Sequence, residues 1–214
     1  MIELLFATHN PHKTEEVRAI LGSQFKVTDL AGHPEISHVE ESGKTLEDNA
    51  VLKAVAVSKR MPGFVVADDS GLEVDALHGR PGVYSARYAS ANATDTENVE
   101  KLLRELARTG AGNDARRARF RCVLALAYEG KVIGTFEGTV DGQISDGLRG
   151  SRGFGYDPIF IPDGFDQTFG ELAPAKKNQL SHRARALEKL REFLGRYGLG
   201  GAGGGAGAPG AAPP

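Results

Sequence analysis

The sequence has 214 residues, a formal net charge of −2 at pH 7 and 40% hydrophobic residues. Lys and Arg are scattered among Asp and Glu, so no overall positive field favours nucleic acid or an anionic membrane surface as a partner. The N-terminus lacks a basic leader, and no apolar stretch approaches the roughly 18 residues that a spanning helix needs, so we expect a cytoplasmic protein.

The chain divides into a folding unit, residues 1–197, and a tail, residues 198–214, that consists almost entirely of Gly, Ala and Pro. Such a tail has few side chains to bury, so we expect it to be disordered. The length of the folding unit suits one α/β domain. The single cysteine, Cys122, excludes a disulfide within the chain and fits a reducing compartment.

The first predicted element is an apolar strand, residues 2–7, that ends in the polar turn Thr8-His9-Asn10-Pro11-His12-Lys13. Pro suits the first position of a helix, which we expect to continue to Gly22. Free N–H groups at a helix start attract anions, and this turn adds a hydroxyl, an amide and an ammonium group. The turn is therefore either a phosphate site or an ordinary capped helix. The chain has no Walker A motif, and no GxGxxG follows a predicted strand.

A second strand is predicted at residues 25–30, followed by a polar loop that contains the acid pair Glu40-Glu41. Thr45 with Asp48 forms a capping-box pattern that opens the next helix, to about residue 60. Asn49 and Lys53 lie one turn apart on this helix and share a face.

Residues 64–88, FVVADDSGLEVDALHGRPGVYSARY, form the most informative stretch of the sequence. A short apolar run stops at Asp68-Asp69-Ser70-Gly71 and an alternating run begins at once, which predicts a strand, a tight acidic turn and a second strand. A turn needs only one Asp or Asn with Gly. The second carboxylate is surplus to the turn and suggests a metal site, whereas the alternative is a solvated hairpin tip.

The next predicted elements have structural roles. A capping-box pattern, Thr94 with Glu97, begins a helix that ends at Gly110, and a basic loop follows at residues 111–117. Residues 118–128 and 132–140 predict a long hairpin with alternating apolar residues.

Residues 150–187 form a second region whose side chains could bind a ligand. Phe154 lies on a Gly-rich loop, where an aromatic ring serves either as a base-stacking platform or as a plug over the edge of the core. A basic cluster, Lys176-Lys177-Asn178 with Ser181-His182-Arg183, is expected at the N-terminus of the final helix. Cations there oppose the helix dipole, which indicates a function rather than a solvated cap.

Together, a helix start suited to phosphates, an acidic set suited to a divalent metal and an aromatic loop with His and Arg suited to a flat polar ring describe a nucleoside triphosphate site. The sequence also resembles the inosine triphosphate pyrophosphatase family, which removes non-standard purine nucleotides. The matching motifs are FATHNPHKTEEV, EESGKTLEDNAVLKA, ADDSGLEVDALHGRPGVYSARYA and GFGYDPIFIPDGFDQTFGEL with KNQLSHRARAL, spread over nearly all of residues 5–187.

This resemblance implies an α/β fold, an elongated mixed β-sheet flanked by helices, with two lobes and the active site in the cleft between them. It implies an enzyme that hydrolyses ITP, dITP and XTP to the monophosphate and pyrophosphate and so keeps them out of DNA and RNA. Mg²⁺ is the implied cofactor and a homodimer the implied assembly.

The residues that match functional positions of the family follow from the same motifs. Asp69 matches the catalytic acid–base position, and Glu40 and Asp69 match the Mg²⁺ ligands. The matches to substrate-binding positions are Thr8, His9, Asn10, Pro11, His12, Lys13, Lys53, Ser70, Phe154, Gly155, Tyr156, Asp157, Lys177, His182 and Arg183. Two departures, His at position 9 where relatives often have Gly and Lys at position 176 where Glu is common, are expected to affect rate and affinity rather than the reaction.

Other interpretations of the same residues stay open at this point. A related pyrophosphatase for modified pyrimidine nucleotides, as in Maf-like proteins, conflicts with the purine-type SHR motif. A nucleotide sensor would not need the acidic set, and the DxDxT spacing of a haloacid-dehalogenase-type phosphatase is absent. The sequence does not separate Asp68 from Asp69 by mechanism, and only the family match favours Asp69.

Overall fold

A six-stranded mixed sheet in the order β2-β1-β3-β4-β5-β6 runs through the part of the chain that the computed structural model describes, residues 1–110 and 116–196. β1 pairs in parallel with β2 and β3, whereas β3, β4, β5 and β6 follow one another in antiparallel pairs. The predicted tail and most of the predicted basic loop lie outside the described residues.

The strands lengthen across the sheet from β2 to β5, a short β6 forms the other edge, and the helices lie in the connections. The strands are β1 (Ile2–Phe6), β2 (Phe25–Asp29), β3 (Phe64–Val74), β4 (Arg117–Tyr128), β5 (Lys131–Ile144) and β6 (Phe160–Pro162). The helices are α1 (Pro11–Leu21), α2 (Leu46–Ser58), α3 (Asp95–Arg108), α4 (Pro174–Leu180) and α5 (His182–Arg196), with a 3-10 segment, η4 (Gly82–Arg87), before α3.

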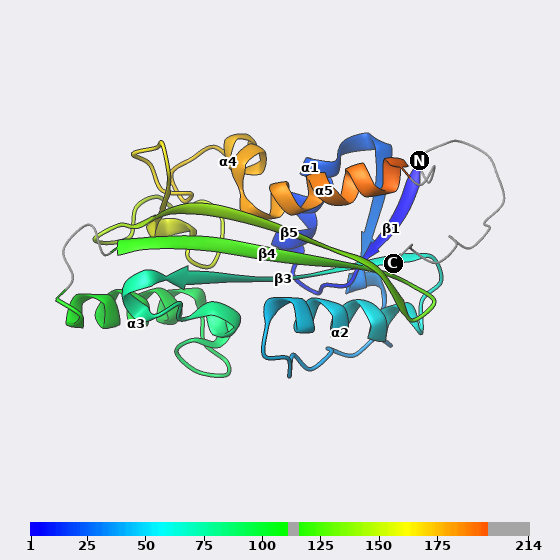
Figure 1. Cartoon of the computed structure of the whole chain (residues 1–214), viewed down its shortest axis with the longest axis horizontal. Helices are drawn as coiled ribbons and strands as arrows, with labels where there is room; N and C mark the ends of the chain where they lie inside the picture. Colours follow the sequence, from blue (N-terminus) through cyan, green and yellow to red (C-terminus); the bar gives the residue numbers. More distant parts are fainter. Residues whose placement is uncertain (111–115, 197–214) are drawn as a thin grey trace.

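Helices cover both faces of the sheet, which gives the molecule its layered and elongated shape (Figure 1). α1, α4 and α5 lie on one side of β3, and α2 and α3 lie on the other. Val66, Leu124 and Leu126 pack against apolar residues of α1 and α5, whereas Val65 and Ala67 pack against α2. The predicted fold, an elongated mixed sheet flanked by helices, is confirmed.

The predicted acidic turn at Asp68-Asp69-Ser70-Gly71 is wrong, because β3 is one continuous strand from Phe64 to Val74. Each of these residues pairs with β4, from Phe64 opposite Tyr128 to Val74 opposite Ala118. The glycine serves close packing instead of a turn, since a Cβ on Gly71 would overlap the carbonyl oxygen of Gly82 in η4. The carboxylates can stay inside the strand because buried cations pair with them, as described below.

The stability of the layer formed by α5 gives a test of this packing. Gly138 on β5 lies under α5, where an added Cβ would overlap the carbonyl oxygen of His182 and lie 2.5 Å from the amide nitrogen of Ala186. We expect Gly138→Ala to lower the free energy of unfolding by about 1–3 kcal/mol, because α5 must shift away from the sheet. Urea unfolding of the two proteins measures this difference.

Gly195 is the matched control, since it lies in α5 itself and an added Cβ there meets no atom within 4 Å. Gly195→Ala should leave the free energy of unfolding unchanged or raise it by up to about 1 kcal/mol, through helix propensity. An unchanged urea midpoint for Gly138→Ala would contradict the close approach of α5 to β5.

Candidate active site

The site opens where β1 ends and β3 continues. The register of the parallel pair closes with Phe6 opposite Val66, and the amide of Ala7 donates a last hydrogen bond of 2.7 Å to the carbonyl of Val66. From Asp68 onward β3 has lost this neighbour, because the chain after β1 turns away into α1. A crevice at the carboxyl end of a parallel strand is the usual place for a ligand in an α/β sheet.

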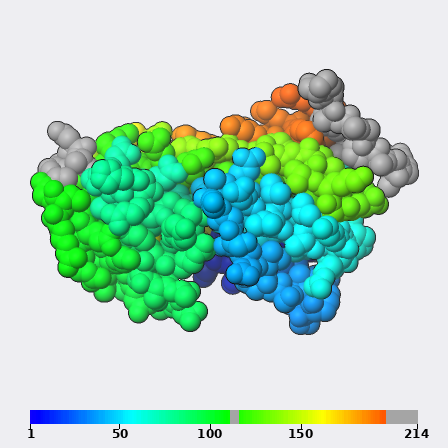
Figure 2. All heavy atoms as spheres, turned by 60° about the horizontal axis from the view of Figure 1, so that its bottom comes forward, coloured from blue at the N-terminus to red at the C-terminus, as the bar shows by residue number. Residues whose placement is uncertain are grey.

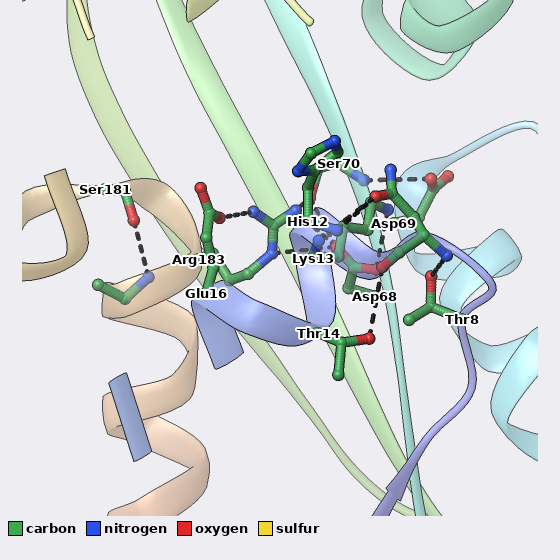
Figure 3. A network of polar contacts seen from close by, with 12 residues as sticks. Thr8, His12, Lys13, Thr14, Glu16, Asp68, Asp69, Ser70, Ser181 and Arg183 are labelled. Atoms are coloured by element: carbon green, nitrogen blue, oxygen red, sulfur yellow. Dashed lines mark hydrogen bonds and ion pairs between the residues drawn. The ribbon is translucent and has the colours of Figure 1, made fainter. Parts of the chain in front are cut away.

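The N-terminus of α1 borders this crevice. Asn10 is the N-cap, and its side-chain oxygen accepts hydrogen bonds from the amides of His12 (3.0 Å) and Lys13 (3.4 Å). The hydroxyl of Thr8 accepts from the amide of Asn10 at 3.1 Å, and Pro11 occupies the first turn, as predicted. The turn therefore has a fixed shape, and the ammonium group of Lys13 points back over β3 (Figure 3).

Asp68 and Asp69 leave β3 in opposite directions, because successive side chains of a strand alternate between its faces. Asp68 faces α1 and α5. Its carboxylate accepts from the Nζ of Lys13 at 2.9 Å, from Nη2 of Arg183 at 2.8 Å and from the hydroxyl of Ser70 at 3.2 Å (Figure 3). Burial alone would raise the pKa of Asp68, but Lys13 and Arg183 outweigh it and hold this pKa well below its usual range. Asp68 is thus a permanently charged partner of two cations.

Asp69 faces α2 and has a different environment. Its carboxylate accepts from Nδ2 of Asn49 at 3.0 Å and lies 3.7 Å from the Nζ of Lys53, so the two residues predicted to share a face of α2 both reach it. Burial raises the pKa of Asp69, the attraction of Lys53 opposes the rise, and the charge of Glu41 adds to it. Of the two carboxylates, Asp69 is therefore the more ready to accept a proton.

The glutamate that the structure brings to this site is Glu41. Its carboxylate accepts from Lys53 at 2.6 Å and from Nη1 of Arg87 at 3.3 Å, and it lines the same pocket as Asp69. Glu40, the predicted metal ligand, is exposed and makes no hydrogen bond or ion pair with the rest of the described chain. The direction of each side chain decides between Glu40 and Glu41, and a match of sequence motifs carries no information on that direction.

Carboxylates that could hold a metal are therefore Asp69 and Glu41. No group of three or more His, Cys, Asp or Glu side chains suited to a metal occurs among the described residues. Mg²⁺ is often held by one or two carboxylates, with substrate phosphates and waters completing its shell. Burial raises the pKa of Asp69 and the negative charge of Glu41 adds to the rise, which fits a place where a divalent cation binds together with its substrate.

The aromatic and basic residues form the opposite side of the site. The ring of Phe154 stacks on His12 with centroids 5.9 Å apart, and Lys177 Nζ lies 4.9 Å from its centroid. The ammonium group of Lys177 donates to Asp157 and to Glu16, both at 2.6 Å. Glu16 was not predicted, although its position one turn after Lys13 on α1 places both side chains on one face. It also accepts from Arg183 at 2.5 Å.

The predicted basic cluster at the start of the final helix is divided between two helices. Lys176 and Lys177 belong to the short helix α4, and His182 begins α5 after a break at Ser181. Lys176 is exposed, whereas Lys177 and Arg183 are buried and paired with acids. These ion pairs remove the conflict with the helix dipole that the sequence indicated.

His182 is the exception among these paired side chains. Its ring stacks on Phe120 with centroids 4.8 Å apart and planes at 11°. Burial, together with the charges of Arg183 and Lys177, lowers its pKa well below the usual value, so the imidazole is neutral. In the described ranges it supplies the single buried side-chain atom without a hydrogen-bond partner, Nδ1.

These residues line two adjoining cavities. The central pocket, of about 170 Å³, is lined by Asn10, Lys13, Glu41, Asp69, Ser70, Gly71, Ser85, Ala86, Asp95, Asn98, Phe120, Phe154, Gly155, Tyr156, Asp157, Lys177, His182 and Arg183. The outer groove, of about 370 Å³, is lined by Ala7, Thr8, His9, Asn10, Lys13, Leu30, His38, Val39, Glu41, Lys53, Val57 and Ala86. The cavities share Asn10, Lys13, Glu41 and Ala86, and Figure 2 shows the surface hollowed between the α2 and α3 segments.

The structure thus brings most of the predicted residues to one cleft. His12 lies beside it, stacked on Phe154, and Pro11 acts through the shape of the helix start. Glu40 is outside, and Glu16, Asn49 and Glu41 are additional residues that the motif match did not assign a role.

Comparison with known proteins places the chain among relatives of similar length. The model of the Ham1 family matches residues 4–193. A dITP/XTP pyrophosphatase of Bacillus subtilis (strain 168) is 49% identical over 195 residues, which cover 91% of this chain and 98% of the relative. A dITP/XTP pyrophosphatase of Geobacillus kaustophilus is 49% identical over 193 residues, covering 90% and 94%.

Solved structures agree with these relatives. A HAM1 protein from Coxiella burnetii is 38% identical with a TM-score of 0.81, covering 92% of this chain and all (100%) of that one. The Staphylococcus aureus Ham1 protein is 42% identical with a TM-score of 0.78, covering 91% and 98%. Both the sequence and the fold therefore match over nearly the whole folding unit, and the chain belongs to the Ham1 family.

Proposed function

We propose that this protein hydrolyses dITP, ITP and XTP to the nucleoside monophosphate and pyrophosphate, which keeps these nucleotides out of DNA and RNA. The relatives named dITP/XTP pyrophosphatase support this substrate class. The observation that carries the proposal is the unpaired, buried Nδ1 of His182 in a pocket that also holds Phe154, with Asp69 and two lysines along the same cleft. We also propose that the protein is a cytoplasmic homodimer, as the motif resemblance implies.

The outer groove suits the phosphates. Lys13 and Lys53 supply ammonium groups there, Thr8 supplies a hydroxyl, and the positive end of α1 adds its dipole. Because Lys13 lines both cavities, it lies where the phosphate chain would pass from one to the other. His9 and His38 border the same groove with rings stacked 6.4 Å apart.

Asp69 is the residue suited to activate water. Its raised pKa, with the ammonium group of Lys53 no nearer than 3.7 Å, allows it to take a proton from a water molecule that attacks the α-phosphorus. The new P–O bond forms as the bond to the bridging oxygen breaks, and pyrophosphate departs. Lys13 and Lys53 stabilise the negative charge on the departing group. Asp68 cannot replace Asp69, because its charge is already held by Lys13 and Arg183.

Mg²⁺ is the cofactor we propose, held by Asp69 and Glu41 on the protein side. When bound, it would polarise phosphate oxygens and neutralise their charge. Without it, Lys53 is the cation that keeps these two carboxylates together, at 2.6 Å from Glu41 and 3.7 Å from Asp69.

The central pocket suits a purine ring. Phe154 borders this pocket with an aromatic ring that can pack against a base, and the charged groups of Lys177 and Arg183 lie 4.9 Å and 5.7 Å from the centroid of that ring. Arg183 is occupied by Asp68 and Glu16, so His182 Nδ1 is the free polar atom for the base. As an N–H donor it fits the O6 acceptor of hypoxanthine or xanthine, whereas adenine presents an amino donor at that place and would leave the group unpaired.

The two aspartates should respond differently to the same substitution. Asp69→Asn should lower the rate of pyrophosphate release from ITP by at least ~10²–10⁴-fold, through loss of the base and of a metal ligand. The free energy of unfolding of this variant should be unchanged, because the charge removed is one that burial disfavours.

Asp68→Asn should instead lower the free energy of unfolding by about 3–5 kcal/mol, because it leaves two cations without their partner. Turnover at saturating Mg²⁺ and urea unfolding measure both effects, and near-normal turnover in Asp69→Asn would remove this residue from the mechanism.

The neighbouring glutamates provide a matched pair for the metal. Glu41→Gln should raise the Mg²⁺ concentration needed for half-maximal activity by about tenfold or more, since one carboxylate ligand is lost. Glu40→Gln changes the same group one residue away on the exposed side and should leave this concentration unchanged. Magnesium titrations of both variants distinguish the two, and the reverse order of effects would assign the ligand to Glu40.

The role of His182 can be tested by replacing its imidazole with an aromatic ring that has no nitrogen. His182→Phe keeps a flat side chain beside Phe120 and should fold normally. We expect kcat/KM for ITP to fall by about ten- to 150-fold, the effect of one unsatisfied hydrogen bond of ~1–3 kcal/mol, while the low kcat/KM for ATP changes little. An unchanged ratio of ITP to ATP efficiency would exclude His182 from base recognition.

A further inference from the structure

The Gly-rich loop that carries Phe154 is anchored on three sides by consecutive residues. The amide of Phe154 donates to Asp157 within the loop at 2.9 Å. The amide of Gly155 donates to the carboxylate of Asp95 at 2.6 Å, sixty positions earlier in the chain. The hydroxyl of Tyr156 donates to the carbonyl of Ser85 in η4 at 2.9 Å. The second and third contacts connect the loop to the segment from η4 to α3.

Asp95 is placed for this contact by its position in α3. Thr94 is the N-cap and forms a capping box with Glu97, which fixes the first turn of the helix. Asp95 follows as the first helical residue, lines the central pocket and forms no ion pair among the described residues. Its carboxylate has a single partner in this part of the chain, the amide of Gly155.

The contact lies next to the aromatic ring that the proposed function uses. Gly155 has a φ of +60°, a conformation that side chains rarely adopt, although a Cβ at this position would meet no neighbouring atom. Glycine therefore favours the bend of the loop here, and its amide is turned toward an acceptor outside the loop, the carboxylate of Asp95. The preceding residue, Phe154, has its ring against His12 and Lys177. The following residue, Tyr156, is buried.

We propose that Asp95 is a positioning residue for nucleotide binding: through the Gly155 amide it holds the loop so that the ring of Phe154 borders the central pocket. The inference rests on the proposed function and adds a residue of α3 to it. A carboxylate acceptor gives a stronger hydrogen bond than a neutral group, so the loop is fixed before a base arrives. Asp95 touches neither base nor phosphate in this role.

The test compares Asp95→Ala and Asp95→Asn with Glu100→Ala. Glu100 carries the same charge at an exposed position of α3 and forms no hydrogen bond or ion pair with the described residues. Amide hydrogen exchange of residues 150–157 in the nucleotide-free protein should become at least tenfold faster in Asp95→Ala and stay unchanged in Glu100→Ala. In Asp95→Asn the side-chain oxygen still accepts, so most of the protection should return. Unchanged exchange in Asp95→Ala would overturn the proposal whatever the enzyme's substrate is.

Measurements of KM and kcat then distinguish a role of Asp95 in positioning the loop from a role in stabilising α3. In Asp95→Ala, KM for ITP should rise about tenfold and kcat should stay within about twofold, since the effect is on binding and not on the reacting atoms. In a Phe154→Ala background, Asp95→Ala should add no further rise in KM, because both act through one ring. Additive effects, or faster exchange without a change in KM, would overturn the role in binding. Absence of ITP hydrolysis by the unaltered protein would instead contradict the proposed function and leave the exchange result to be judged separately.

Discussion

Two adjacent carboxylates leave β3 in opposite directions, and the arrangement of the site depends on this separation. The pleat of the strand sends Asp68 toward α1 and α5 and Asp69 toward α2, so identical groups one residue apart acquire opposite pKa shifts. The difference comes from geometry alone. A tight turn at the same sequence would have exposed both carboxylates to water and removed the contrast between them.

The charges around Asp68 extend into a chain of alternating sign. Lys13, Asp68, Arg183, Glu16, Lys177 and Asp157 follow one another through ion pairs of 2.5–2.9 Å. Three cations and three anions balance in this chain, so a largely buried network carries little net charge. Such a network is expensive to disturb at any one member, and it connects α1, β3, α4, α5 and the aromatic loop in one rigid arrangement. Glu16 joins the two halves of this chain, because it accepts from both Arg183 and Lys177.

Much of the fold could be predicted from the sequence, because it depends on local patterns. Capping boxes at Thr45 and Thr94, the proline at the start of α1 and the alternating residues of β4 all predicted elements that the structure contains. The prediction failed at Gly71, where a residue typical of turns serves close packing against Gly82 in η4. Local sequence does not record which distant backbone will approach a glycine.

The site was predictable in its membership and less so in its geometry. Motifs identified the cleft residues, but neighbouring acids could not be ranked, since Glu41 points to Lys53 and Glu40 to the exterior only in the folded chain. Likewise, the need to balance Lys177 and Arg183 became visible only when α4 and α5 were seen as separate helices around Glu16.

The length of the central strands restricts how the cleft can close. β3, β4 and β5 contain 11, 12 and 14 residues, run along the long axis of the molecule between the helix layers and are paired along almost their full length (Figure 1). A hinge between the two lobes would have to break several ladder hydrogen bonds at once. Any closure on a ligand is therefore expected from a segment outside the sheet, such as the stretch between β2 and α2, while the sheet itself stays rigid. Asp69, on the central strand β3, would keep its position during such a movement.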